Sequence, residues 1–371
     1  MSMSTLKILL VEDEQDVISN WKSEVDLHNA DQSKHEFTIE METAASDPDA
    51  RRMLELHRFD AAVVDLRLRT GEGAAENNSQ GNDLVRHILE THPIGIAIYT
   101  GQSACADEFR DAGNEICRQV RVFDKGDGIP PVFRWLAEQK DMLLRLRQAK
   151  ATFNGQTARM FFRSIWPRWE TWDSQISDKE ELAKALIRHI VAHVHDALLD
   201  ANDGQVHPEE AYFVPPLKER LETGDLFVDQ QNGTWILVTP RCDLANPGKV
   251  ETVLLASCND ISEEWQRQLE ESGRAKKWMQ RMMQHDRSSK QHFLHPMVAP
   301  DGSQKGPWMV QFHKLKVLSV DELKDPPVDG ERSQSSSLKR MASLSPLYIP
   351  SLVERFGAYF SRIGTPDCSS H

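Results

Sequence analysis

The residues of this chain best suited to chemistry are polar side chains that come directly after short apolar runs. Four such runs, at 6–11, 61–64, 94–99 and 120–123, lead into five of them: Glu12, Asp13, Asp65, Thr100 and Lys125. Carboxylates, a hydroxyl and an amine are the groups needed to transfer a phosphoryl group to a carboxylate. The sequence therefore points to phosphoryl-transfer chemistry.

Each side chain has a distinct expected role in such a reaction. The nucleophile is a carboxylate that stands clear of the sheet, here Asp65. A divalent cation neutralises phosphate oxygens, and oxygen ligands from Asp13, Asp65 and the Arg67 carbonyl suit six-coordinate Mg²⁺, which keeps several waters. A fixed ammonium group, here Lys125, contacts another phosphate oxygen, and the hydroxyl of Thr100 senses the product.

Short buried strands must position these residues. The four apolar runs and a fainter strand at 37–42 (FTIEME) give five strands. Between them, residues 48–57 and 81–90 carry apolar side chains at spacings of three and four, which indicates helices. The alternation predicts an α/β fold with a doubly wound five-stranded parallel sheet. Chemistry in such sheets lies at the carboxyl ends of the strands, where the polar residues fall.

Over about residues 5–140 the chain resembles response-regulator receiver domains of two-component systems. The resemblance assigns these roles: Asp65 as the phospho-acceptor, Asp13 as the direct acidic metal ligand, Glu12 as the second acid acting through water, Thr100 in YTG as the switch hydroxyl, and Lys125 in FDKG as the phosphate-contacting lysine. It implies Mg²⁺ as the cofactor and a sensor histidine kinase as the partner.

Three departures from the receiver pattern affect the response to phosphorylation more than phosphorylation itself. Val122 stands where the family usually has Tyr or Phe, and the nearest aromatic, Phe123, falls on the opposite face of the strand. Gly126 replaces the usual proline after the lysine. The segment from Asp65 to Gly81 is longer than the family norm, which predicts either a mobile flap beside the site or a passive surface insertion.

The organisation of the whole chain follows from these elements. We predict a receiver domain at 1–128, a connector helix at 129–150 and an α+β effector or interaction domain at 151–371. The apolar stripe of the connector exceeds what docking needs, so a homodimer seam is an alternative reading. Residues 224–246 (GDLFVDQQNGTWILVTPRCDLAN) faintly resemble small SH3-like barrels of the toxin-nuclease type, through a GD turn before the first long strand.

The C-terminal domain has one chemically rich cluster, formed by Arg241, Cys242 and Asp243. In one reading Arg241 contacts an anion, and Cys242 or Asp243 belongs to a site. In the other, the cluster is an ordinary strand end with a buried thiol and an acidic cap. Because burial makes a thiol inert unless a cation lowers its pKa, the second reading is favoured.

The helical stretch after residue 150 contains histidines and tryptophans at regular spacings. His189 and His193 are four apart, as in a zinc pair, but the glutamate of a zinc protease is missing, so ordinary histidines are favoured. Trp166, Trp169 and Trp172 share one helical face. Core packing or an interdomain contact is the favoured interpretation, and stacking on nucleobases is the alternative.

Charge and composition exclude several classes of function. Net charge is -13, with 18 basic against 27 acidic residues in 1–150 and 26 against 30 in the remainder, which disfavours general nucleic-acid binding. No run approaches the roughly 18–20 apolar residues that span a bilayer, so no membrane association is expected. Five scattered cysteines without a CxxC pair favour reduced thiols and the cytoplasm.

The sequence therefore predicts a response regulator with a non-transcriptional output, because no basic recognition helix follows the receiver. Its C-terminal domain is expected to act as an adaptor for an effector protein or to make the chain a phosphate sink. Bacterial antiviral two-component systems include such receivers, and this chain is similar to them in outline. The alternative is a phosphorylation-gated effector enzyme, nuclease-like in its C-terminal domain.

Overall fold

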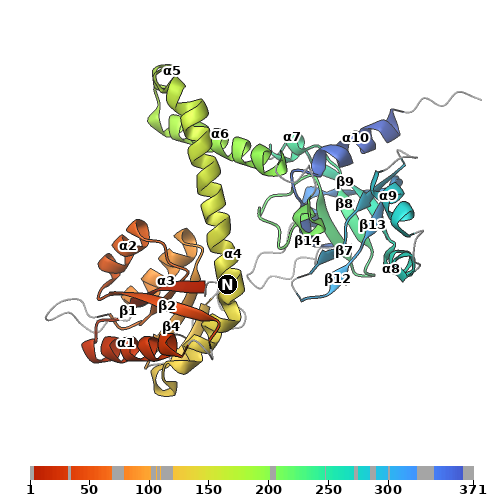
Figure 1. The fold of residues 1–371 in the computed structure, drawn as a ribbon. Coiled ribbons are helices and arrows are strands. Elements are labelled where there is room, and N and C mark those ends of the chain that lie inside the picture. The colour runs from red at the N-terminus through yellow and green to blue at the C-terminus, as the bar shows by residue number, and fades with distance from the viewer. Residues whose placement is uncertain are drawn as a thin grey trace, which may run out of the picture. The chain divides into compact units, whose positions relative to one another are not determined.

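A computed structural model describes residues 4–31, 35–68, 79–101, 106, 109, 120–200, 206–246, 248–270, 275–284, 290–299, 301–323 and 338–361. The chain forms two compact units, residues 1–198 and 199–371 (Figure 1). No helix among these described residues is long and apolar enough to cross a membrane.

The first unit contains a five-stranded parallel sheet with the order β2-β1-β3-β4-β5. Its strands are β1 (Ser4–Val11), β2 (Phe37–Ala44), β3 (Ala61–Val64), β4 (Gly95–Thr100) and β5 (Val120–Asp124). The helices of this unit begin with α1 (Gln15–Ala30), α2 (Asp47–Leu56), α3 (Ser79–Thr91) and α4 (Pro130–Met160). The predicted doubly wound α/β fold is therefore confirmed, and its strand order reverses direction at β1 and β3.

Both faces of this sheet are buried, which explains why its strands read as unbroken apolar runs. Alternate residues of β1 point to opposite faces: Leu9 and Val11 belong to the core beneath α2 and α3. Ile8 and Leu10 belong to the core shared with α1 and α4. Trp21 of α1 is fully buried in that second core. It packs edge-on against Tyr99 of β4, with the ring centroids 5.4 Å apart.

Helix α4 docks on the sheet with its first half and then continues beyond it (Figure 1). Val132, Leu136 and Leu143 are buried against the sheet. Arg147 donates hydrogen bonds to the Thr5 carbonyl at 3.1 Å and to the carboxylate of Asp60, just before β3, at 3.0 Å. The helix predicted at 129–150 thus continues for ten residues, to Met160.

A helical arm, residues 152–200, follows the docked part of α4. After Met160 it consists of a π-helical turn (Phe161–Ile165), a 3-10 turn (Trp166–Arg168), α5 (Trp169–Gln175) and α6 (Lys179–Asp200). The compact unit of the receiver sheet extends to Leu198, whereas the sequence placed a boundary at residue 150. The predicted end of the receiver domain at residue 128 therefore stays a prediction.

The second unit is built on a seven-stranded antiparallel sheet with the order β10-β13-β9-β8-β7-β14-β6. Its strands are β6 (Tyr212–Phe213), β7 (Asp225–Asp229), β8 (Thr234–Leu237), β9 (Thr252–Asp260), β10 (Gln291–Leu294), β13 (Trp308–Ser319) and β14 (Leu338–Leu344), and a separate ribbon joins β11 (Met297–Val298) to β12 (Gln304–Lys305). Its helices are η6 (Pro208–Ala211), α7 (Arg241–Leu244), α8 (Ser262–Glu270), α9 (Ala275–Gln284), η7 (Val320–Leu323) and α10 (Ile349–Phe360). A separate α+β domain after the receiver is confirmed.

The two faces of this sheet belong to two separate cores, and its described strands do not close into a hydrogen-bonded barrel. The edge strands β6 and β10 are linked through the Tyr212 hydroxyl, which donates to the His295 carbonyl at 2.6 Å. Helix α10 covers one of these cores: Leu352 is fully buried and Phe356 packs edge-on against Phe312, with ring centroids 5.4 Å apart. The C-terminal helix thus docks on this core through one of its faces.

Candidate functional site

Four of the polar residues that the sequence singled out lie together at the carboxyl end of the parallel sheet. Glu12 and Asp13 directly follow β1, Asp65 follows β3 and Lys125 follows β5. Parallel pairing fixes this arrangement, because the amide of Asp65 donates to the Val11 carbonyl at 2.9 Å. Residues far apart in the chain are therefore neighbours at one edge of the sheet.

Lys125 bridges two buried carboxylates. Its Nζ lies 2.7 Å from Glu12 Oε2 and 2.8 Å from Asp65 Oδ2, while Glu12 is 1% and Asp65 5% exposed. Burial raises the pKa of Glu12, and the hydrogen bond from Lys125 offsets this only in part. Burial alone would lower the pKa of Lys125, but its hydrogen bonds to Asp65 and Glu12 outweigh burial and leave the pKa raised. The lysine is therefore held in its charged form.

The acids of this site have the right chemistry for a hard divalent cation. Carboxylate oxygens of Glu12, Asp13 and Asp65 lie within 4.8 Å of one another, and no other group of three acids, histidines or cysteines in the described chain is so close. Oxygen-only donors of this kind suit Mg²⁺. The amide of Arg67 donates to Asp65 Oδ1 at 3.3 Å, whereas the metal contact predicted for its carbonyl stays a prediction.

Thr100, the predicted switch hydroxyl, lies at the carboxyl end of the parallel sheet, and its role stays a prediction. Thr100 is the last residue of β4, is fully buried and pairs in register with Asp124 of β5. Val122 packs into the core beneath α2 and α3. Phe123 packs into the opposite core, where its ring lies 6.1 Å from that of Trp135. The aromatic side chain of β5 is therefore on the wrong face to act as a partner of Thr100.

A local hydrogen bond shapes the loop that carries Lys125. The side chain of Asp124 accepts from the amide of Gly126 at 2.7 Å and caps the 3-10 turn Lys125–Asp127. Aspartate often forms such a turn with the backbone two residues on. This cap, rather than the proline usual in the family, holds the lysine loop.

Gly81 is a structural determinant of the site that the sequence analysis missed. It lies in the first turns of α3, where a Cβ atom would come within 2.4 Å of Leu66 Cα and 2.8 Å of the Asp65 carbonyl oxygen. Only glycine allows the helix this close to the backbone of Asp65 and Leu66. A glycine just after the long segment was the available signal. Of that predicted flap or insertion, residues 69–78 lie outside the described part of the chain.

The cluster predicted in the C-terminal domain does not converge on one pocket. Arg241 Nε pairs with Glu222 Oε2 at 2.9 Å, whereas Asp243 Oδ1 pairs with Lys249 Nζ at 2.5 Å. Cys242 is exposed, not buried as one reading required, and its sulfur lies 3.8 Å from Asp243 Oδ1. The arrangement is that of surface ion pairs beside a free thiol.

The histidines and tryptophans of the arm do not assemble a metal site in the described residues. The rings of His189 and His193 are 4.8 Å apart and meet edge to face, with Trp172 packed on His189. Trp166 is 63% and Trp169 40% exposed. Of the two favoured interpretations of the tryptophan series, core packing is therefore wrong for Trp166, and an interdomain contact stays a prediction.

Comparison with known proteins finds relatives of the first unit among solved structures. No family model matches the chain, and no curated protein matches it. A receiver domain from Methylobacillus flagellatus is 19% identical, covers 36% of this chain and 99% of its own, and has a TM-score of 0.26. The response regulator TrrA from Thermotoga maritima, in complex with Mg²⁺ and BeF, is 16% identical, covers 37% and 98%, and has a TM-score of 0.27.

A third solved structure, the RcsB response regulator from Salmonella typhimurium, is 13% identical, covers 50% of this chain and 99% of its own, and has a TM-score of 0.28. The decisive observations lie in the chain itself. Its parallel strand order β2-β1-β3-β4-β5 is that of the flavodoxin-like fold, with the acids, the buried threonine and the lysine at the strand ends. The first unit therefore has the doubly wound parallel fold that the sequence predicted for a receiver domain.

Proposed function

We propose that this response regulator accepts a phosphoryl group on Asp65 from a sensor histidine kinase, with Mg²⁺, in the cytoplasm. The observation that carries the proposal is the bridge from Lys125 to Glu12 and Asp65, which holds a buried nucleophile next to a fixed cation. A carboxylate oxygen of Asp65 attacks phosphorus, and the bond from phosphorus to the kinase imidazole breaks. The aspartyl phosphate keeps the phosphoryl group, and the imidazole leaves as the free side chain.

Different residues of the chain would orient the nucleophile, contact the phosphoryl group and bind the metal in this step. Backbone pairing between Val11 and Asp65 orients the nucleophile, and Lys125 is within reach of an oxygen of an incoming phosphoryl group. Mg²⁺ bound by Glu12, Asp13 and Asp65 would neutralise phosphate charge. The metal would also relieve repulsion among these carboxylates, which Lys125 opposes at Glu12 and Asp65. Binding of the cation would therefore make the site more favourable for transfer of a phosphoryl group to Asp65.

The charge added at Asp65 would be about -1.5 to -2 at neutral pH. In this chain an aromatic ring on β5 cannot relay it, because Phe123 packs away from Thr100. Helix α4 is the other continuous element, since it follows the lysine loop directly and extends into the arm. We infer that a change at Lys125 is passed to α4 through this loop.

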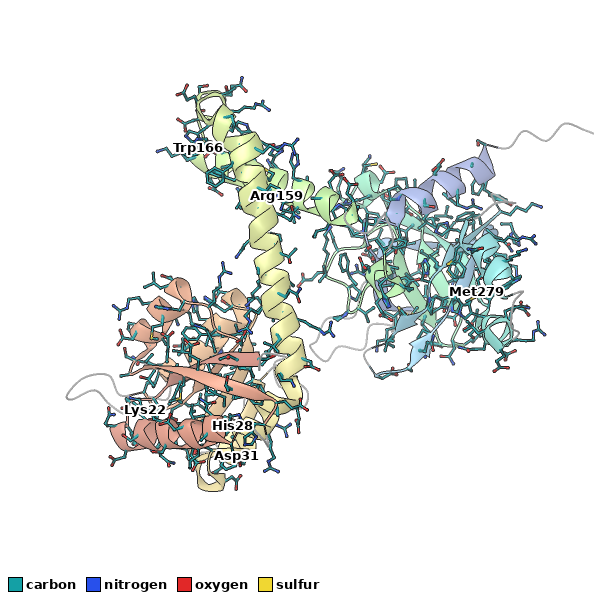
Figure 2. The ribbon with its side chains drawn as sticks, viewed as in Figure 1. Lys22, His28, Asp31, Arg159, Trp166 and Met279 are labelled. Carbon is teal, nitrogen blue, oxygen red and sulfur yellow. The ribbon has the colours of Figure 1, made fainter. Side chains whose placement is uncertain are left out.

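An exposed aromatic cluster on the arm supports the role of adaptor. Phe162 is 66% and Trp166 63% exposed, and their ring centroids are 6.4 Å apart (Figure 2). Phe161 packs on both rings, at 5.2 and 5.8 Å. Large aromatic side chains with arginines nearby, here Arg159 and Arg163, are typical anchors of protein interfaces. The arm thus offers a binding surface that needs no catalysis.

The phospho-acceptor assignment is tested with acetyl phosphate and Mg²⁺. Intact-mass spectrometry of the wild-type chain should show one added phosphoryl group, and omission of Mg²⁺ should abolish it. The Asp65→Asn variant should stay unlabelled, while the matched control Asp83→Asn, on the exposed side of α3, should be labelled like wild type. Equal labelling of the Asp65→Asn variant would refute the assignment.

A role in bacterial antiviral defence, as adaptor or phosphate sink, belongs to the same proposal. Host cells that carry the wild-type system should survive phage infection better than cells with the Asp65→Asn variant. A phosphate sink should still drain phosphoryl groups from the kinase when Phe162→Ala and Trp166→Ala are combined. An adaptor should lose its output in that double variant while Asp65 is labelled normally.

A phosphorylation-gated enzyme is the second candidate, and one pocket of the C-terminal unit favours it. Lys218, Arg220, Asp243 and Arg340 line this pocket together with apolar side chains. Cations around an apolar cleft could hold a nucleic-acid backbone. Cleavage of RNA or DNA by the phosphorylated chain, lost in the Asp243→Ala variant, would support the enzyme. Absence of cleavage with intact phosphorylation would leave the adaptor.

A further inference from the structure

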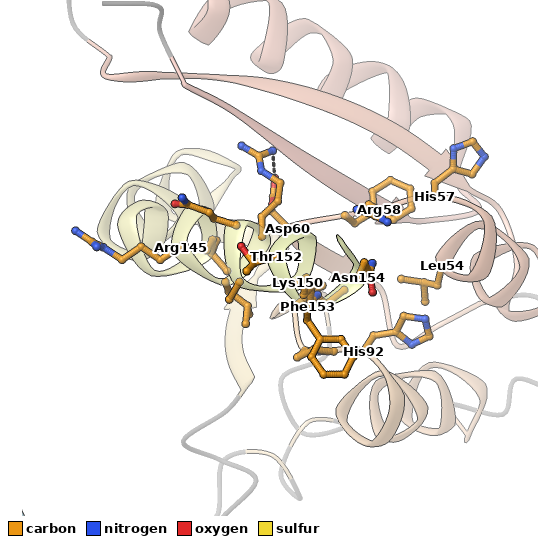
Figure 3. A pocket seen from close by; sticks show the side chains of 18 of the residues that line it. Leu54, His57, Arg58, Asp60, His92, Arg145, Lys150, Thr152, Phe153 and Asn154 are labelled. Carbon is orange, nitrogen blue, oxygen red and sulfur yellow. Dashed lines mark hydrogen bonds and ion pairs between the residues drawn. The ribbon is translucent and has the colours of Figure 1, made fainter. Parts of the chain in front are cut away.

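A pocket lies at the end of the receiver sheet opposite to Asp65 (Figure 3). Its receiver side is formed by the segments that lead into β3 and β4, including Arg58 and His92, and by Leu54 of α2. Its other side is the middle of α4, from which Lys150 and Phe153 reach the same space. The pocket thus joins the receiver floor to the helix that leaves it.

Four cationic side chains line the pocket, those of Arg58, Arg145, Arg147 and Lys150, and among the described residues only Arg147 of these four has an ion pair. Neither Lys150, which is half-buried, nor Arg58 has an ion pair there. Two acids, Glu55 and Asp60, line the pocket as well, and Asp60 already accepts from the Lys7 amide at 2.8 Å and from Arg147 at 3.0 Å. Burial lowers the pKa of Lys150; Asp60 opposes this, and the positive charge of Arg58 adds to it. An anion between Lys150 and Arg58 would relieve both repulsion and desolvation.

The remaining walls are largely apolar. Leu54 and Phe59 contribute from the receiver core, and Leu146 and Phe153 from α4. Phe153 is 45% exposed, which is unusual for a phenylalanine this close to a protein core. A ligand with an apolar body would therefore cover surface that is otherwise in contact with water.

His92 adds a polar group that is mostly neutral near pH 7. Burial lowers its pKa, with the neighbouring His87 as the second cause. Its Nδ1 is engaged by the Thr91 hydroxyl at 2.6 Å. It can therefore hydrogen-bond a ligand without adding a further positive charge to the pocket.

We propose that this pocket binds a small amphipathic organic anion. Lys150 and Arg58 bind its carboxylate, sulfonate or phosphate group, and Phe153 contacts its apolar body. Such a ligand would touch the receiver floor and α4 at once. It would therefore fix the docked part of α4 from the end opposite to Asp65, as a second input to the same helix.

The test uses the full-length chain and two probes, anilinonaphthalene sulfonate and decanoate. The sulfonate should bind with a rise in fluorescence, and decanoate should displace it. Because a charge-assisted hydrogen bond is lost, the Lys150→Gln variant should raise the dissociation constant of both probes about tenfold or more. The Phe153→Ala variant should weaken them as well. Inorganic phosphate, which lacks an apolar body, should displace the sulfonate only weakly.

Matched controls separate this pocket from the exposed aromatic cluster of the arm. Lys184→Gln removes an arm lysine that pairs with Glu180, and Phe162→Ala removes the most exposed arm phenylalanine. Both variants should bind the probes like wild type. Normal labelling of Asp65 by acetyl phosphate in the Lys150→Gln variant shows that the receiver is folded.

Three results would overturn the proposal. The first is failure of either probe to bind the wild-type chain. The second is binding that the Phe162→Ala variant loses and the Lys150→Gln variant retains, because the probe would then lie on the arm. The third is an acidic peptide that binds through Lys150 while decanoate does not, because the pocket would then be a protein docking site.

Discussion

Replacement of Lys125 by methionine tests the central geometry of the receiver site. The substitution keeps the length and apolar stem of the side chain but removes its charge. Glu12 and Asp65, both almost completely buried, then face each other without the ammonium group that lies 2.7 and 2.8 Å from them. The variant should therefore be less stable, chiefly in the receiver domain.

The size of the effect follows from burial. Removing one partner of a buried ion pair typically costs 3–5 kcal/mol, and because 21% of the Lys125 side chain is exposed we expect about 3 kcal/mol. Amide hydrogen exchange through unfolding should then accelerate on the order of 100-fold, since each 1.4 kcal/mol is a factor of ten. Lys7→Met, which breaks an exposed pair with Glu40, is the matched control and should change exchange little.

The pH dependence has a defined sign. In wild type the pKa of Lys125 is raised, so its stabilisation is present below its ordinary value of 10.5 and is lost only as pH rises beyond it. In the variant the pKa of Glu12, already raised by burial, loses the lysine that lowered it. The folded variant then binds a proton more readily than the unfolded chain. The loss of stability of the variant relative to wild type should therefore be largest at neutral pH and become smaller towards pH 5.

Mg²⁺ should reduce the same deficit, because a divalent cation among Glu12, Asp13 and Asp65 replaces the missing positive charge. Hydrogen exchange read by mass spectrometry measures β1 and β3 separately, with β9 and β13 of the second unit as internal reference. An unchanged exchange rate in β1 and β3 would refute the bridge. A loss of stability that neither low pH nor Mg²⁺ reduces would show that lost packing, not lost charge, is responsible.

Three further outcomes are expected. Gly81→Ala should cost about 1–3 kcal/mol by overpacking against the Asp65 backbone and slow labelling by acetyl phosphate, whereas Gly155→Ala, with open space around it, should stabilise α4 by up to about 1 kcal/mol. Arg340→Met should leave Asp225, 0% exposed and paired at 2.9 Å, without its cation, and lower the urea stability of the second unit by about 3 kcal/mol. Cys258, buried and with its thiol pKa raised, should resist iodoacetamide at pH 8 until urea unfolds the chain, as its peptide mass would report.

The sequence determined the receiver site because the physics that places it is local. Apolar runs too short for helices must be buried strands, and parallel strands put their carboxyl ends at one edge. Asp65 and Lys125 therefore had to meet, although 60 residues separate them. The period of two along β5 likewise predicts opposite faces for Val122 and Phe123, and the two side chains do pack into opposite cores.

The sequence could not decide contacts that depend on how elements pack. Spacing showed that Trp166 shares a face with its neighbours, but not whether anything covers that face. The close approach of Gly81 to Asp65 depends on the angle at which α3 meets the sheet. The separate ion pairs of Arg241 and Asp243 depend on where the chain places Glu222 and Lys249.

The sequence by itself thus determined the parallel sheet, the meeting of Asp65 with Lys125 and the opposite faces of Val122 and Phe123, whereas the roles of these residues stay predictions. Only the tertiary structure decided that Arg58, Lys150 and Phe153 line one pocket. The reason is physical. The periodicity of a strand or helix depends on residues close together in the sequence, whereas a pocket is the space left between segments that are far apart in the sequence and pack together only in the fold.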